Sequence, residues 1–190
     1  MHSFTFDTNC LIDLDEKRPA SQFVWELIDA HRQGIVSVAF VSVSASERQK
    51  GDYYLPSYQD FVDRLETLGV QDIPQIMGMF YWGLSYWGQC IYGDKLGIAR
   101  ELALHKALFP KIPFYFAEYA KKTGLSEGDT QKKEAKKWRN AWCDRQMVWA
   151  HDYHKRDVFV SSDGNFKSLA KYQEFRNVIV STPEEATQLL

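Results

Sequence analysis

The 190-residue sequence lacks several features that would place it in a specialised class of protein. It has only three cysteines, at positions 10, 90 and 143, and their wide spacing fits neither a disulfide framework nor a zinc site. No uncharged run approaches the roughly 18 apolar residues of a membrane-spanning helix. The opening residues, MHSFTFDTNC, have neither the basic start nor the apolar core of a signal peptide. These absences predict a soluble, cytoplasmic protein.

The sequence also lacks an excess of charge of one sign. It has 23 Lys and Arg residues and 25 Asp and Glu residues, which gives a net charge of −2. This balance does not mark a nucleic-acid binder, but net charge governs solubility and says little about a local site. Apolar residues make up 45% of the chain, as in ordinary globular proteins. Since no linker rich in Pro, Gly or Ser is present, we expect one domain over residues 1–190.

Short β-favouring runs alternate with helical patterns along the chain. The expected strands cover residues 3–7, 34–42, 70–73, 157–163 and 177–182. The expected helices cover residues 18–34, 43–50, 56–69, 94–108, 129–154 and 183–190. Strands that alternate with helices predict βαβ crossovers, and therefore an α/β fold with a central, mainly parallel sheet of four to five strands.

One segment, residues 76–93, is dense in aromatic residues and interrupted by glycines at regular intervals. We expect an aromatic-rich helical insertion at about 75–125, made of two helices of which the second is 94–108. The aromatic residues are Phe80, Tyr81, Trp82, Tyr86, Trp87 and Tyr92. Such rings can stack the bases of single-stranded nucleic acid, but packing in the core or against another protein is the favoured interpretation.

The stretch SFTFDTNCLIDLD, residues 3–15, places Asp7 where the first expected strand ends. Two interpretations of this acid are open: it caps the following helix, or it contributes to a metal site. The second expected strand leads to Glu47, and the fourth ends in Asp163. Because the carboxyl ends of parallel strands share one edge of the sheet, we expect these acids to meet there, joined by Asp144 from the long helix.

Several carboxylates in one place repel each other unless a cation or shared protons relieve the repulsion. A carboxylate cluster without a matching set of His or Cys residues suits hard divalent ions, Mg²⁺ or Mn²⁺. Two such ions about 3.5–4 Å apart would activate a water molecule and stabilise the leaving oxygen of a phosphodiester. The acids therefore favour metal-dependent phosphodiester hydrolysis.

Four short motifs, taken together, resemble those of PIN domains. FDTNCLIDL resembles their opening motif, in which a hydrophobic strand leads to Asp-Thr/Ser-Asn and an apolar helix. VSVSASERQ resembles their second motif, a Ser-bearing strand end followed by a Glu. CDRQMVWAHDYHKRDVFVSSDGNF resembles the third and fourth, an Asp on a helix and then a strand that ends in Thr/Ser-x-Asp-x-x-Phe. The resemblance covers about residues 3–50 and 135–182.

This resemblance implies a three-layer α/β/α domain and a metal-dependent endoribonuclease that uses Mg²⁺ or Mn²⁺. Carried over by position, the metal-binding and catalytic acids would be Asp7, Glu47, Asp144 and Asp163. Asn9 and Ser161 would complete the catalytic set by hydrogen-bonding a carboxylate or a bound water. Ser161 stands where Thr is commoner in the family, a change that keeps the hydroxyl.

The biological role implied by the resemblance is less specific than the chemistry. The toxin of a toxin–antitoxin pair is one version, with an antitoxin or other protein partner and a possible homodimer, although the middle segment is longer than in compact toxin-type members. A non-catalytic PIN-fold scaffold for RNA or protein is the rival from another class, and the intact acids disfavour it. A phosphatase with an Asp-x-Asp motif is disfavoured because Asn9 replaces the second acid.

Some residues near these motifs also allow an ordinary interpretation. If Glu47 lies in the first turn of a helix, the helix dipole alone would favour an acid there, without any metal. Asp152 is a reserve candidate for the site, whereas His151 and His154 are expected to be ordinary residues at a helix end. Both cysteines beside site positions, at 10 and 143, are expected to pack as small apolar side chains.

A basic run precedes Asp144 on the long helix. Helical spacing puts Lys136, Lys137 and Asn140 on the same side as Asp144, so that the cations would lead a phosphate backbone towards the acids. A solvated helix face is an equal alternative. The predicted RNA-binding residues are Lys136, Lys137 and Arg139.

Overall fold

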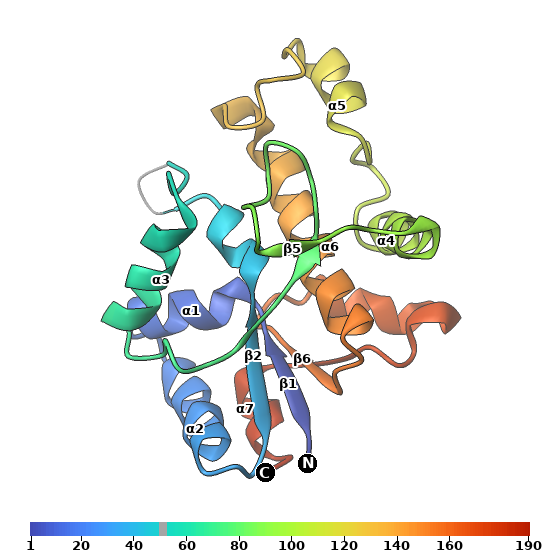
Figure 1. Cartoon of the computed structure of the whole chain (residues 1–190). Helices are drawn as coiled ribbons and strands as arrows, with labels where there is room; N and C mark the ends of the chain where they lie inside the picture. Colours follow the sequence, from blue (N-terminus) through green and yellow to red (C-terminus); the bar gives the residue numbers. More distant parts are fainter. Residues whose placement is uncertain (50–52) are drawn as a thin grey trace.

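The computed structural model describes residues 1–49 and 53–190 of the chain. Its centre is a five-stranded sheet in the order β3-β2-β1-β6-β7, and each neighbouring pair of strands runs parallel (Figure 1). The strands are β1 (Ser3–Phe6), β2 (Ser37–Val41), β3 (Gln75–Ile76), β6 (Val158–Val160) and β7 (Ile179–Ser181). The predicted α/β fold class with a parallel central sheet is confirmed.

Helices cover both faces of this sheet and give the expected three layers. One layer contains α1 (Thr8–Asp15), α2 (Ser21–Arg32), α3 (Tyr58–Thr67) and α7 (Pro183–Thr187). The opposite layer contains α4 (Lys95–Leu108), α6 (Lys136–Tyr153) and the 3₁₀ helices η3 (Phe166–Lys171) and η4 (Gln173–Phe175). Between α4 and α6 the chain forms α5 (Phe116–Thr123) and the 3₁₀ helix η2 (Lys133–Ala135).

The alternation of side chains along the strands produces two hydrophobic cores. Phe4 and Phe6 of β1 are fully buried against the layer that contains α1 and α2. Thr5, between them, points to the other face, where its hydroxyl lies 3.0 Å from Nδ1 of His151 in α6. Phe159 of β6 packs on that same face. Burial on both faces is typical of parallel sheets that are covered by helices on each side.

Two expected elements are shifted along the chain. The strand expected at 70–73 lies at β3 instead, because Val70 and Ile73 are buried in the core beneath the end of α3. The helix expected over 129–154 begins only at α6, since η2 occupies the residues just before it. The final helix starts as predicted at Pro183, with Thr182 and Glu185 forming a capping box around its first turn.

The aromatic segment 76–93 is not helical, which corrects the expectation of a first helix there. It contains two short strands, β4 (Gly78–Met79) and β5 (Cys90–Ile91), which pair in parallel. Gly83 and Gly88 between them have φ values of 70° and 75°, which glycine adopts without strain. Gly83 and Gly88 therefore make turns in a loop, whereas Gly78 begins β4. The second expected helix of this region is present as α4.

Among the described residues, no helix combines the length and apolar character needed to cross a bilayer. The cysteines form no disulfide, and Cys10 and Cys143 are buried among apolar side chains, as expected. Burial raises the pKa of both thiols well above its usual range. Neither thiol is therefore suited to act as a nucleophile at neutral pH.

Candidate functional site

A cavity of about 330 Å³ lies at the carboxyl edge of the sheet, and we call it the acid cavity. The structure brings all four predicted acids together here, although they come from four separate segments of the chain. The residues that line it are Asp7, Thr8, Asn9, Ile12, Glu47, Arg48, Gln49, Lys136, Asn140, Asp144 and Asp163. This gathering is what the parallel strand order predicts for side chains at strand ends.

Asp7 follows β1 and occupies the position before the first turn of α1, but its side chain makes no capping hydrogen bond. Its Oδ2 atom instead accepts hydrogen bonds from Ser161 Oγ at 2.6 Å and from Asn9 Nδ2 at 2.9 Å. These two bonds hold the buried carboxylate in the acid cavity. The capping interpretation of Asp7 is therefore not supported.

The turn after β6 is fixed by hydrogen bonds that run through the same serine. The Ser161 hydroxyl accepts a bond from the backbone N–H of Asp163 at 3.0 Å. The backbone N–H of Asn165 donates to Asp163 Oδ1 at 2.8 Å. Ser161 thus connects Asp7 and Asp163, the first and last of the four predicted acids, and its hydroxyl makes both contacts.

Glu47 follows the 3₁₀ helix η1 (Ser42–Ser46) with an extended backbone, φ −77° and ψ 155°. It therefore does not lie in the first turn of a helix, and the helix-dipole interpretation does not apply. The expected helix over 43–50 is replaced by η1, and its last position, Lys50, lies outside the described residues. Thr8 of α1, whose role sequence reasoning missed, donates a hydrogen bond to Ser44 Oγ at 2.8 Å and so joins the Asp7 and Glu47 segments.

Asp144 belongs to a row on α6. Lys136, Asn140 and Asp144 are spaced by four residues, and all three line the acid cavity. Lys137 is exposed but lies outside the lining. The row predicted from helical spacing therefore reaches the cavity through Lys136 and Asn140.

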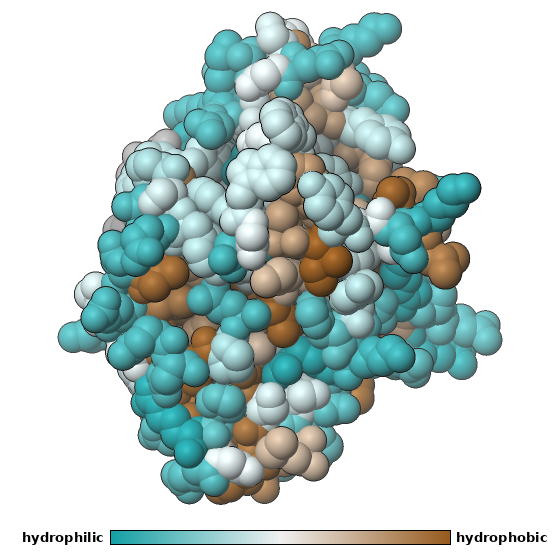
Figure 2. Space-filling model, viewed as in Figure 1, coloured by the Kyte–Doolittle hydropathy of each residue, from teal (hydrophilic) through white to brown (hydrophobic). Residues whose placement is uncertain are grey.

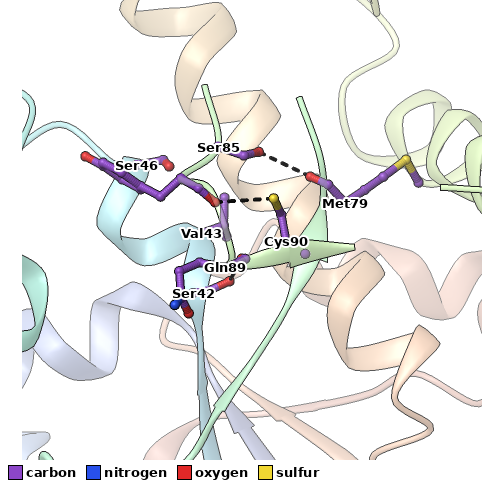
Figure 3. A pocket seen from close by; sticks show the side chains of 9 residues that line it. Ser42, Val43, Ser46, Met79, Ser85, Gln89 and Cys90 are labelled. Carbon is purple, nitrogen blue, oxygen red and sulfur yellow. Dashed lines mark hydrogen bonds between the residues drawn. The ribbon is translucent and has the colours of Figure 1, made fainter. Parts of the chain in front are cut away.

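The insertion forms a wall behind η1. In Figure 3, side chains of η1 and of the insertion, among them Ser42, Ser46, Met79 and Gln89, surround a cavity of about 10 Å³. Ser42 Oγ donates to the carbonyl of Gln89 at 2.7 Å, and Ser46 Oγ donates to the carbonyl of Leu84 at 2.8 Å. The contact leaves no room for a ligand, so its role is to fix the position of η1 and hence of Glu47.

Burial and mutual repulsion raise the pKa values of three of the acids. Burial raises the pKa of Asp7 from 3.8 to about 6, against the lowering effect of the bonds from Ser161 and Asn9. Burial, followed by the charge of Asp7, raises the pKa of Glu47 to about 8. Burial and the neighbouring acids also raise the pKa of Asp144 well above its usual range. A bound cation would relieve this strain.

The donors of the acid cavity fit a hard divalent cation. They are carboxylate and amide oxygens, with no His or Cys in the lining. Among residues 1–49 and 53–190, no three acid, His or Cys side chains stand close enough to coordinate one ion together.

Arg139 is placed differently from the exposed lysines with which it was grouped. It is only 3% exposed, and its Nε and Nη2 atoms donate to the carbonyl of Ser46 at 3.2 and 2.8 Å. Its guanidinium also lies 4.5 Å from the centre of the Tyr54 ring. Arg139 therefore holds the chain beside Glu47 and does not present its charge to a ligand at the surface. Its charge partly offsets the rise in the pKa of Glu47 that burial and Asp7 cause.

The remaining candidates lie outside the acid cavity. Asp152 forms an ion pair with Arg100 at 2.8 Å. His151 packs beside Thr5 beneath the sheet, and His154 lies 3.2 Å from the carbonyl of Met77. None of these three residues lines the acid cavity, so the structure places them as ordinary residues at the end of α6.

The fold and the cavity together define a parallel α/β protein with an acidic site at the carboxyl edge of its sheet. No family model and no curated protein matches the sequence. Among solved structures, a similar chain belongs to VapBC2 from Rickettsia felis bound to a DNA fragment from their promoter. The two chains are 12% identical with a TM-score of 0.42, over 95% of this chain and 98% of that one. The chemistry of the site is therefore argued from the residues of this chain.

Proposed function

We propose that this protein is a divalent-metal-dependent endoribonuclease of the PIN type, which hydrolyses RNA phosphodiester bonds. The observation that carries the proposal is the acid cavity itself, where Asp7, Glu47, Asp144 and Asp163 meet at the carboxyl edge of the sheet. Purely structural acids would not need to share a site in which burial and repulsion raise the pKa values of Asp7, Glu47 and Asp144.

The predicted site residues have separate roles in this proposal. Each Mg²⁺ or Mn²⁺ ion would take one or two of the four acids, with waters as its other ligands, and when bound would supply an activated water and neutralise charge on the phosphate. Ser161 and Asn9 fix the Asp7 carboxylate by donating bonds of 2.6 and 2.9 Å to its Oδ2 atom. Their donated protons favour the ionised carboxylate that a cation requires.

Lys136 supplies positive charge at the edge of the same cavity. It is exposed, and a lysine in this place attracts the phosphate backbone without sequence preference. Exposed Lys137 would add to this attraction one residue along α6. Arg139, which is buried, is excluded from the proposed RNA contacts.

The test is a cleavage assay on single-stranded and structured RNA with Mg²⁺, with Mn²⁺ and with EDTA. Wild type should cut only with a metal, and Asp7→Asn and Asp163→Asn should each lower the rate by at least about a hundredfold. Asp157→Asn is a matched control, because Asp157 is bonded to Ser3 far from the cavity. The proposal fails if wild type cuts with neither metal or if the two site variants cut as well as wild type. RNA binding without cleavage would favour the non-catalytic scaffold.

A role as the toxin of a toxin–antitoxin pair remains a narrower proposal that rests on the sequence resemblance. It predicts that expression of the wild-type chain in bacteria stops growth, whereas Asp7→Asn does not. Co-expression of a small neighbouring gene product should restore growth if that product is the antitoxin. Growth that is unaffected by the wild-type chain would contradict this role without affecting the proposed chemistry.

A further inference from the structure

Four rings of the insertion form an exposed cluster on the loop between β4 and β5 and just after it, and we call them the aromatic cluster. Trp82, Trp87 and Tyr92 are 79%, 68% and 75% exposed, while Phe80 is half-buried among them. The centre of the Phe80 ring lies 5.3 Å from those of Trp87 and Tyr92 and 6.4 Å from that of Trp82. In Figure 2, pale side chains gather over the segment that Figure 1 draws in green.

Of the six aromatic residues expected to pack in the core or against another protein, Tyr81 and Tyr86 pack against the two cores. Trp82, Trp87 and Tyr92 do not pack in the core, because they are exposed. Exposed tryptophans lose the free energy that burial of their large apolar area would give, so a cluster of them marks a binding surface. The planes of neighbouring rings in the cluster are inclined to each other by 43° to 88°. Tilted and edge-on contacts of this kind leave ring faces open on the outside, where a planar ligand can stack.

The loop that carries the rings is fixed to segments that neighbour the acid cavity in the chain. Besides the two serine bonds from η1, the Tyr86 hydroxyl donates to the carbonyl of Leu55 at 2.6 Å. Gln146 of α6 accepts a hydrogen bond from the backbone N–H of Met79 at 2.8 Å. The aromatic cluster is therefore held in a set position relative to the elements that carry Glu47 and Asp144.

A groove of about 590 Å³ lies beside the cluster, between Trp82 and Gly83 on one side and residues 127–132 on the other. Two acids, Glu127 and Asp129, line it, and Lys132 forms an ion pair with Asp129 at 3.0 Å. Lys132 is followed by η2 and then by Lys136, which lines the acid cavity. Four residues at about 2 Å each put the two lysines roughly 8 Å apart along the chain.

We propose that the aromatic cluster is a stacking platform for the bases of single-stranded RNA, whose backbone continues past residues 127–132 to Lys136 and the acid cavity. This inference rests on the proposed ribonuclease function and specifies its substrate as single-stranded. Stacking on aromatic rings tolerates any base and excludes duplex RNA, whose bases are already stacked on each other. The platform and the acids would then hold one strand at two points.

Binding is measured by fluorescence anisotropy of a labelled, short, single-stranded oligonucleotide in EDTA, so that no cleavage is required. The Trp82→Ala/Trp87→Ala double variant should bind at least about tenfold more weakly than wild type, because each stacked base is worth about 1–3 kcal/mol. Trp82→Phe/Trp87→Phe keeps the rings and should retain most of the affinity. Tyr172→Ala, which removes an exposed ring on the η3–η4 side, is the matched control and should bind as wild type.

Two results would overturn the proposal. The first is equal affinity of wild type and the Ala double variant for the single strand, with unchanged thermal unfolding of both proteins. The second is a loss of self-association in the Ala double variant, seen by light scattering, while its RNA affinity stays the same; this would make the cluster a contact between copies of the chain. Either result leaves the proposed cleavage untouched, because that is tested separately through Asp7 and Asp163.

Discussion

Replacement of Asp7 by Asn should make the metal-free protein more stable, although it should abolish cleavage. Asp7 is 2% exposed, and burial raises its pKa from 3.8 to about 6. At pH 7.5 the folded protein must therefore keep a carboxylate ionised in a place that disfavours the charge. The neutral amide of Asn keeps an oxygen that can accept the bonds from Ser161 and Asn9.

The magnitude follows from the two pKa values. The difference between about 6 and 3.8 corresponds to about 3 kcal/mol, since one pKa unit is worth about 1.4 kcal/mol. Because charge-assisted hydrogen bonds are stronger than neutral ones, we expect the variant to gain about 1–3 kcal/mol. For a chain of this size each kcal/mol raises the melting temperature by about 2–4 °C.

The sign of the pH dependence provides a second check. The folded pKa lies above the unfolded one, so the destabilisation is fully present above about pH 6 and disappears as the pH falls towards 3.8. The stability difference between Asp7→Asn and wild type should therefore be large at pH 7.5 and small at pH 4. Unfolding in urea with EDTA, followed by tryptophan fluorescence, measures both values.

A surface acid whose pKa is shifted in the opposite direction serves as the control. Hydrogen bonds from Ser3 lower the pKa of Asp157, so Asp157→Asn should destabilise the protein. Added Mg²⁺ should stabilise wild type and have less effect on Asp7→Asn, since binding to the folded state alone raises its stability. The reasoning is refuted if Asp7→Asn is less stable than wild type in EDTA at pH 7.5.

Three further predictions concern other parts of the molecule. Burial lowers the pKa of His151 from 6.5 to about 4, so the free energy of unfolding of wild type should fall by up to about 3 kcal/mol as the pH drops through this range. His151→Gln should remove that loss, and equal pH dependence of the two proteins in urea unfolding would contradict the prediction. Glu101→Gln leaves the charge of fully buried Arg145 without its partner at 2.6 Å. The variant should lose about 3–5 kcal/mol of unfolding free energy in urea, whereas a loss below about 1 kcal/mol would show that the pair contributes little. Lys136→Ala should weaken RNA binding similarly for all sequences and reduce the slope of log affinity against log salt by about 1, and an unchanged slope would remove Lys136 from the RNA path.

The acid cavity could be predicted from the sequence because its geometry depends on short-range signals. Asp7 and Asp163 each follow an apolar run that forms a central strand, and parallel strands bring such positions to one edge. Asp144 and Lys136 share a helix face through a spacing of four residues. The strand ends and the helix period thus contain most of the information on where these side chains lie.

The positions that sequence reasoning misplaced depend on contacts between distant segments. Arg139 has the local setting of an exposed cation, but it is buried because η1 and Tyr54 close over it. Val70 and Ile73 have the composition of a strand and fill the core instead, so the strand forms a few residues later. Local pattern cannot distinguish an apolar residue that pairs in a sheet from one that only fills space.

Hydrogen bonds from the insertion hold the two elements that carry Asp144 and Glu47. Glu101 of α4 accepts hydrogen bonds from Arg145 at 2.6 Å and from Gln146 at 2.8 Å, the two residues that follow Asp144 on α6. Gln146 also accepts the bond from Met79 of β4, so the insertion fixes the rotation of α6 about its own axis. The same insertion holds η1 through Ser42 and so positions Glu47. Two of the four acids therefore depend on a segment that contributes no acid itself, and changes in the insertion should alter the site before they alter the sheet.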